Sequence, residues 1–256
     1  MNINNVVLKI GGSILFSEFP PPSNIVKTAI HVLKDFVLLI KDKNPNAKIA
    51  IIIGGGKPAR NYIKLAQELS LSSFIQDTVG ILTTRINALI LMHGLKRLFE
   101  NDKNYSIANR ISNFIAESSY HVLELMERND IIFAGGYFPG QSTIGPAALT
   151  AEAMKAKLLL IATNVPGVFS EDPVKNPSAH KYDELTISYL KKILARQESK
   201  PGTYKIMDLV AANIIERSQI HTIIFDARDF QNVVKVIKHY MNNNLEAIKK
   251  IGTIIK

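Results

Sequence analysis

The chain has 256 residues, 46% of them hydrophobic, and its 31 lysines and arginines outnumber its 22 aspartates and glutamates, giving a net charge of +9. This length and composition exclude a disordered chain and leave room for one large domain or two modest ones with a full core. The lack of cysteine excludes disulfide bonds and thiolate metal sites, and the six histidines lack the spacing of zinc ligands.

Two short apolar runs, at 6–10 and 49–53, each end in a turn of small residues, Gly-Gly-Ser at 11–13 and Gly-Gly-Gly at 54–56. The runs are rich in β-branched residues and nearly continuous, which is typical of parallel strands covered on both faces. Where such a strand meets a following helix, unpaired backbone N–H groups and the positive end of the helix dipole attract anions. Either turn alone is equally typical of a tight connection without a ligand. Two of them in one chain favour a site for two phosphate groups.

The rest of the chain alternates between predicted helices and strands. After the second turn, we expect a helix with Pro58 at a first helical position and with Ile63, Ala66 and Leu69 on its apolar face. Further helices are predicted over 25–41, 78–99, 118–127, 147–155, 207–217 and 229–241, and further strands over 131–134, 158–162 and 222–225. This alternation predicts an α/β fold, a three-layer α/β/α sandwich around a mostly parallel central sheet, with ligands at the carboxyl ends of the strands. Because no repeat or low-complexity linker divides the chain, residues 1–256 are expected to form a single domain whose lobes share one sheet.

Four charged residues are candidates for binding ligands. Lys9 closes an otherwise apolar strand, where an ammonium group is costly unless it meets an anion. A lysine that extends its charge into water is the alternative. Arg60 offers a planar fork suited to phosphate, although a surface salt bridge is equally consistent with its spacing. Asp77 stands just before a predicted helix, where an N-cap is the simplest interpretation, and Asp208 stands at the start of another, where a helix-start acid is the alternative.

The glycine turns match neither a P-loop, because proline follows Lys57, nor the G-x-G-x-x-G of dinucleotide-binding folds. The chain instead has Leu-Lys-Ile-Gly-Gly-Ser at 8–13, Gly-Gly-Gly-Lys-Pro-Ala-Arg at 54–60, Gly-Gly-Tyr-Phe-Pro-Gly-Gln-Ser-Thr at 135–143, Ala-Thr-Asn-Val-Pro-Gly-Val-Phe-Ser-Glu-Asp-Pro at 162–173, Gly-Thr-Tyr at 202–204, and Asp208. From about residue 5 to residue 255, this order resembles the amino acid kinase family and, within it, the archaeal-type uridylate (UMP) kinase branch. The segment 139–143 is the most specific part of the resemblance. Asn164 stands where bacterial-type enzymes commonly have lysine, which favours the archaeal branch.

The resemblance implies an ATP-dependent nucleoside monophosphate kinase that makes UDP from UMP, with Mg²⁺ arriving bound to ATP and with no metal cage built by the protein. Lys9 would bridge the donor and acceptor phosphates and Asp208 would orient it, so these two are the expected catalytic residues. The residues implied for ATP are Gly12, Ser13, Gly56, Arg60, Thr163, Asn164, Phe169 and Asp172. Those implied for UMP are Gly55, Asp77, Tyr137, Phe138, Pro139, Gly140, Gln141, Ser142 and Thr143. Residues 1–145 would form mainly the UMP side, and residues 146–256 the ATP side.

The resemblance also implies a homo-oligomer, typically a hexamer, and the unusually apolar segment 79–89 is a candidate subunit face, with ordinary core as its alternative. No apolar stretch is expected to span a bilayer and no signal region is apparent, so we expect a cytoplasmic enzyme. The lysines are spread along amphipathic segments, so neither nucleic-acid nor membrane partners are expected. Pro166 departs from the aspartate that is usual in the family. Two alternatives stay open: a related kinase of another small phosphate or carboxylate, and a non-catalytic nucleotide-binding regulator or storage protein on the same fold.

Overall fold

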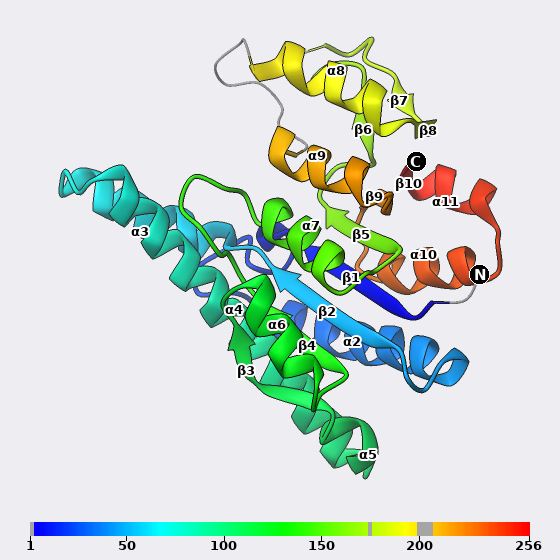
Figure 1. Ribbon diagram of the computed structural model, residues 1–256. Helices are drawn as coiled ribbons and strands as arrows, with labels where there is room; N and C mark the ends of the chain where they lie inside the picture. Colours follow the sequence, from blue (N-terminus) through cyan, green and yellow to red (C-terminus); the bar gives the residue numbers. More distant parts are fainter. Residues whose placement is uncertain (1–2, 174–175, 199–206) are drawn as a thin grey trace.

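A continuous sheet runs through the computed structural model, which describes residues 3–173, 176–198 and 207–256 (Figure 1). In this part of the chain the sheet has eight strands, in the order β3-β4-β2-β1-β5-β9-β10-β8. Its strands are β1 (Asn5–Ile10), β2 (Lys48–Ile53), β3 (Ile111–Ala116), β4 (Ile131–Ala134), β5 (Leu158–Thr163), β8 (Glu184–Leu185), β9 (His221–Asp226) and β10 (Gly252–Ile255). A separate antiparallel pair joins β6 (Val168–Phe169) to β7 (Lys181–Tyr182). The helices are α1 (Gly12–Leu15), α2 (Ser23–Lys43), α3 (Gly56–Glu68), α4 (Ser73–Asn101), α5 (Tyr105–Ala108), α6 (Ser119–Met126), α7 (Ile144–Ala153), α8 (Ile187–Glu198), α9 (Leu209–Arg217), α10 (Asn232–Met241) and α11 (Leu245–Ile251).

The strand β1 lies in the middle of the sheet, between β2 and β5. It pairs with both of these strands in parallel, whereas β10 pairs with β9 in the antiparallel direction. The strands between residues 48 and 134 lie on the β2 side of β1 and those between residues 158 and 255 lie on the β5 side, so the winding of the chain reverses at β1. In doubly wound sheets, ligands bind at the carboxyl ends of the strands at such a switch point. The fold therefore brings the turn after β1, the turn after β2 and the end of β5 to one edge of the sheet.

Helices cover both faces of the sheet and bury two hydrophobic cores (Figure 1). Successive residues of β1 alternate between the cores, because neighbouring side chains of a strand point to opposite faces. Leu8 packs in the core beneath α2, α4 and α10, and Val7 packs in the core formed with α7 and α9. Both faces are buried, which explains why the strands read as apolar runs without polar alternation. The predicted α/β/α sandwich around a mostly parallel sheet is confirmed.

The helices α3 and α4 differ most from their predicted form. The helix α4 begins at Ser73, before its predicted start, so Asp77 lies inside the helix and Ser72 occupies the N-cap position. In α3, Pro58 is the third helical residue and not the first, and Leu69 is 63% exposed, so the expected apolar face is only partly buried. The helix α3 packs on α4, and α3 and the N-terminal part of α4 extend beyond the sheet as an arm (Figure 1).

Three strands of the sheet have no apolar run that signals them in the sequence. The edge strand β3 contains the adjacent polar residues Ser112 and Asn113, and β8 and β10 have only two and four residues. A short or polar segment acquires strand structure from the neighbour that it pairs with, and local sequence carries little of that information. These strands were therefore absent from the predicted elements.

The helix α4 is the one helix in the described ranges that is long and apolar enough, by length and composition, to cross a bilayer. The expectation that no stretch would qualify was wrong. In the fold, α4 buries Ala88, Leu91 and Leu95 in the core, and it also buries the polar residues Thr84 and Asn87. Core helices of globular domains have the same composition, and packing against the sheet explains the apolar character of this face.

Candidate active site

The two glycine turns pack directly against each other at the carboxyl edge of the sheet. A Cβ atom added to Gly12 would lie 2.6 Å from the carbonyl oxygen of Gly54 and would also collide with the amide nitrogen of Gly56. Gly56 has a φ of +65°, a left-handed conformation that favours glycine, and a Cβ there would lie 2.5 Å from the carbonyl oxygen of Phe16. The close approach therefore requires glycine in both turns.

A first cavity of about 460 Å³ opens beside the second turn, and we call it the α4 cavity. Eight of the predicted site residues line it: Gly55, Gly56, Arg60, Asp77, Phe138, Gln141, Ser142 and Thr143. Gly136 of the 135–143 motif lines it as well. Among the described residues, the amide N–H groups of Gly55 and Gly56 donate no hydrogen bond. Since these groups stand at the start of α3, they form an anion-binding position in the cavity wall.

Arg60 and Asp77 both line the α4 cavity and differ in their polar partners. Arg60 is exposed and has no carboxylate within 4.0 Å among the described residues, so the structure does not support the surface salt bridge. Asp77 accepts a hydrogen bond at 2.8 Å from the backbone N–H of Gly140. The resemblance groups Gly56 and Arg60 with the ATP residues, whereas the structure places both in the same cavity as Asp77.

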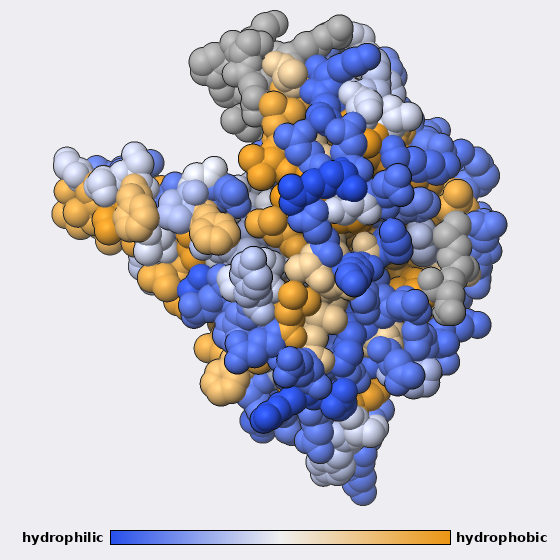
Figure 2. Space-filling view, viewed as in Figure 1, coloured by the Kyte–Doolittle hydropathy of each residue, from blue (hydrophilic) through white to orange (hydrophobic). Residues whose placement is uncertain are grey.

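A second cavity of about 520 Å³, which we call the β5 cavity, opens at the carboxyl ends of β1 and β5. The polar side chains that line it are those of Lys9, Ser142, Thr163, Asn164 and Asp208. Ser142 lines both cavities, Gly140 lines the β5 cavity and Gln141 lines the α4 cavity, so the 140–142 segment is a shared wall between them. In the space-filling view, the surface is notched between the α3–α4 arm and the part that carries α8 and α9 (Figure 2). Residues from both sides of this notch line the two cavities.

Lys9 is buried in the wall of the β5 cavity without a neutralising partner. Burial lowers the pKa of its ammonium group to about 8, and no carboxylate lies within 4.0 Å among the described residues. Asp208 accepts hydrogen bonds instead from the Ser142 hydroxyl at 3.1 Å and from the backbone N–H of Ala211 at 2.8 Å. The second bond makes Asp208 the N-cap of α9, so it shares the cavity with Lys9 without pairing with it. A buried cation in this state is stabilised by an incoming anion.

Several predicted site residues do not contribute side chains to either cavity. The ring of Tyr137 is buried in the core, where burial raises its pKa to about 12 and its hydroxyl bonds to the Thr150 hydroxyl at 2.7 Å. Its side chain points away from the α4 cavity because it occupies the sheet-facing position of a turn whose next residue, Phe138, lines that cavity. The others outside both cavity walls are Gly12, Ser13, Pro139, Phe169 and Asp172. The Gly-Thr-Tyr motif at 202–204 lies outside the described residues.

Two buried polar residues of α4 were missed by the sequence analysis. The Asn87 side-chain amide donates to the carbonyl oxygens of Gly54 and Gly55, at 3.0 Å each. The Thr84 hydroxyl accepts from the backbone N–H of Gly136 at 2.7 Å. Their signal in the sequence was present: a threonine and an asparagine three positions apart, hence on one face, within an otherwise apolar helix.

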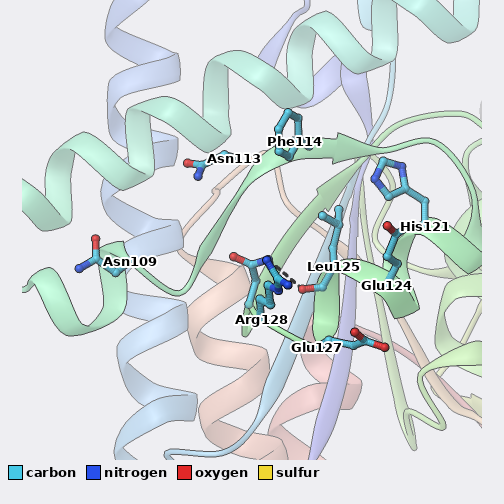
Figure 3. Close-up of a pocket in the computed structure, with 9 residues that line it drawn as sticks. Asn109, Asn113, Phe114, His121, Glu124, Leu125, Glu127 and Arg128 are labelled. Atoms are coloured by element: carbon cyan, nitrogen blue, oxygen red, sulfur yellow. Dashed lines mark hydrogen bonds between the residues drawn. The ribbon is translucent and has the colours of Figure 1, made fainter.

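A third cavity of about 740 Å³ lies between β3 and α6, away from the glycine turns (Figure 3). Its lining is mixed, with Asn113 and Phe114 from β3 and His121 and Glu124 from α6, and none of the predicted site residues contributes to it. Among the described residues, no group of three or more histidines and acids could hold a metal ion. The chemistry-bearing residues are thus concentrated in the α4 and β5 cavities.

The chain is similar to known kinases over nearly its whole length. Uridylate kinases of Thermococcus kodakarensis and Archaeoglobus fulgidus are 35% and 36% identical to the chain over 233 residues, which is 91% of this chain and 95% of each relative. The crystal structure of uridylate kinase from Archaeoglobus fulgidus superposes with a TM-score of 0.73 at 32% identity, covering 98% of this chain and 99% of that one. UMP kinase from Bacillus anthracis shares the fold, with a TM-score of 0.72 at 22% identity. The model of the amino acid kinase family matches residues 4–226, so the chain belongs to the amino acid kinase family.

Proposed function

We propose that the protein transfers the γ-phosphoryl group of Mg·ATP to UMP, giving ADP and UDP. The observation that carries this proposal is the buried, unneutralised ammonium of Lys9 beside a wall shared by two cavities, one of which has free glycine N–H groups and an unpaired arginine. A group in that place suits a reaction in which negative charge passes from one cavity to the other. The named uridylate kinase relatives extend over nearly the whole chain, which supports this acceptor.

In the proposed mechanism the α4 cavity holds UMP. Its 5′-phosphate is largely dianionic near neutral pH, since its second pKa is about 6, so an oxygen of this phosphate attacks without a general base. The N–H groups of Gly55 and Gly56 and the guanidinium of Arg60 bind that phosphate, and Asp77 accepts from the ribose hydroxyls. Gln141 and Thr143 stand in the same cavity as polar partners for the uracil. The protein thereby supplies alignment for an in-line displacement.

The β5 cavity is proposed to hold the phosphates of ATP, with Lys9 beside the transferred group and Thr163 and Asn164 on the nucleotide side. As the new P–O bond forms, the bond between the γ-phosphorus and the bridging oxygen breaks, and ADP leaves. Lys9 stabilises the negative charge on the transferred group. Mg²⁺ enters as part of the substrate, and a single cavity carboxylate, Asp208, suits an ion that stays on phosphates and water. We place this reaction in the cytoplasm, with residues 1–145 forming mainly the UMP side.

Product analysis tests the proposed reaction directly. The purified protein is incubated with Mg·ATP and a panel of phosphate and carboxylate acceptors, and the products are separated by anion-exchange chromatography. We expect UDP from UMP. Turnover of another acceptor without UDP from UMP would show a different kinase, and nucleotide binding without any transfer would favour the regulator or storage alternative.

Replacing Asp77 by asparagine is expected to raise the KM for UMP about tenfold or more and to leave the KM for ATP unchanged. The asparagine keeps an oxygen for the Gly140 N–H, which Asp77 bonds at 2.8 Å, but loses the charge that strengthens acceptance from ribose hydroxyls. The matched control is 2′,3′-dideoxy-UMP, for which wild type and variant should have similar KM values. An increase confined to the KM for ATP would contradict the ribose assignment.

We also propose that the protein assembles through the outer face of α4. Leu82, Ile86, Leu89 and Ile90 lie on this face with exposed fractions of 43–55%, an apolar strip that suits contact with another subunit. Changing Ile86 to glutamate should therefore lower the molar mass measured by light scattering. Tyr105→Glu, at a position of matching exposure on α5, serves as the control and should leave the mass unchanged. A wild-type protein that is monomeric would contradict this proposal.

A further inference from the structure

The buried polar residues of α4 hold the two loops that line the α4 cavity. Asn87 is 3% exposed, and its amide nitrogen donates to the carbonyl oxygens of Gly54 and Gly55 at 3.0 Å each. One turn earlier, the Thr84 hydroxyl accepts from the Gly136 N–H at 2.7 Å and donates to the Ile81 carbonyl oxygen at 2.6 Å. One face of α4 is therefore hydrogen-bonded both to the turn after β2 and to the turn after β4.

The Asn87 bonds fix the direction of two N–H groups in the cavity. A trans peptide is planar and its C=O and N–H point in opposite directions, so a hydrogen bond to the Gly54 carbonyl orients the Gly55 N–H. In the same way, the bond to the Gly55 carbonyl orients the Gly56 N–H. Both bonds come from the α4 side of the turn, so the N–H groups are aimed away from Asn87. A hydrogen bond to a carbonyl also polarises the peptide, which strengthens its N–H as a donor to an anion.

Glycine turns need this support because glycine restricts its own backbone least of all residues. Without the Asn87 amide, the peptides at 54–56 can rotate, and ordering them then opposes the binding of a phosphate. We propose that Asn87 is a positioning residue for the acceptor phosphate: it preorganises the Gly55 and Gly56 N–H groups without touching the substrate. This inference rests on the proposed function, because it deepens the role of the α4 cavity as the acceptor site.

The test compares ligands that differ only in the phosphate. Asn87→Leu removes both donors at similar volume, and Asn87→Ser leaves a hydroxyl that can donate one hydrogen bond. By titration calorimetry, we expect Asn87→Leu to weaken UMP binding about tenfold or more, Asn87→Ser to weaken it less, and uridine binding to change in neither. The KM for ATP should also be unchanged, since the β5 cavity does not contain this turn's N–H groups.

Thr83→Val is the matched control. Thr83 is also buried on α4, at 4% exposure, but its hydroxyl donates to the Val79 carbonyl of its own helix at 2.8 Å. Its loss should leave UMP binding at the wild-type value. If Asn87→Leu and Asn87→Ser bind UMP as wild type does, or lose uridine and UMP equally, Asn87 has only a structural role and the inference is overturned.

Experiments on the wild-type protein alone test the proposed function, separately from the role of Asn87. If wild type neither binds nor phosphorylates UMP, the proposed function falls, and the same variants are compared for binding of inorganic phosphate by ³¹P NMR. That ligand needs neither uracil nor ribose. Weaker phosphate binding in Asn87→Leu supports the positioning role, and unchanged binding overturns it.

Discussion

Replacement of Lys9 by methionine is expected to lower kcat for UDP formation about 100-fold or more, with smaller changes in the KM values for ATP and UMP. The ammonium is the one buried, unneutralised cation of the β5 cavity wall in the described part of the chain, and its charge is needed most when the γ-phosphoryl group is between donor and acceptor. Steady-state kinetics with each substrate varied in turn measure this split. Wild-type turnover in the variant would refute the role of Lys9.

The same substitution should make the protein more stable. Burial lowers the pKa of Lys9 to about 8, below its value in the unfolded chain, so the unfolded state binds the proton more readily. The charged lysine therefore destabilises the fold below pH 8, and this penalty disappears as the pH rises toward 10. At pH 7, methionine should raise the free energy of unfolding by on the order of 2 kcal/mol. If Lys9→Met loses activity and gains stability, Lys9 serves catalysis and does not stabilise the fold.

Lys48→Met is the matched control for this experiment. Lys48 also carries a partly buried ammonium, but its three donors are used by the carbonyl oxygens of Met126 and Asn129 and by Asp130. Its loss should lower stability and leave kcat unchanged at temperatures where the variant is folded. In wild type, kcat/KM should fall above about pH 8, where free Lys9 loses its proton. In the bound state the phosphates raise the pKa of Lys9, so the fall in kcat should occur at higher pH.

Much of the fold could be predicted because its central strands are buried on both faces. The runs at 6–10 and 49–53 match β1 and β2, and the prediction of a strand at 131–134 matches β4. These segments signal their structure locally, through continuous β-branched residues. The strand β3 could not be found in this way, because an edge strand with polar residues depends on pairing with β4, which local sequence does not encode.

The site could be predicted in its backbone but not in all of its side chains. The glycine turns and Lys9 were identified because their residue types are costly or unusual at strand ends, whatever the fold around them. The orientation of Tyr137 depends instead on which side of a turn faces the core, and the motif does not specify this. Asn87 escaped notice because its partners, Gly54 and Gly55, lie more than 30 positions away in the sequence. Long-range polar contacts of this kind become visible only when helix and strand are packed together.

Replacement of Asp130 by asparagine is expected to lower the free energy of unfolding at pH 7 by about 3 to 5 kcal/mol. The Asp130 carboxylate is largely buried, and it accepts hydrogen bonds from Lys41 and Lys48 at 2.8 Å each and from Arg110 at 2.7 Å. It is the carboxylate shared by these three cations at the end of the sheet opposite the β5 cavity. Asparagine leaves them without a counter-charge in a partly dry environment. Chemical denaturation of wild type and variant measures the loss, and kcat should be unchanged below the melting temperature.

The pH dependence of this stability loss shows whether the charge of Asp130 causes it. Burial by itself raises the pKa of this carboxyl, but the hydrogen bonds from Arg110, Lys41 and Lys48 outweigh burial and hold it far below its usual range. A carboxyl with a depressed pKa in the folded state stabilises the protein fully above its unfolded pKa of about 4 and loses that contribution as the pH falls further. The stability gap between wild type and Asp130→Asn should therefore narrow from pH 5 toward pH 2. Glu68→Gln, which breaks an exposed pair with Lys64, is the control and should change stability by about 0.5 kcal/mol or less at any pH. A gap that stays constant with pH would show that the variant acts through packing and not through the buried charge.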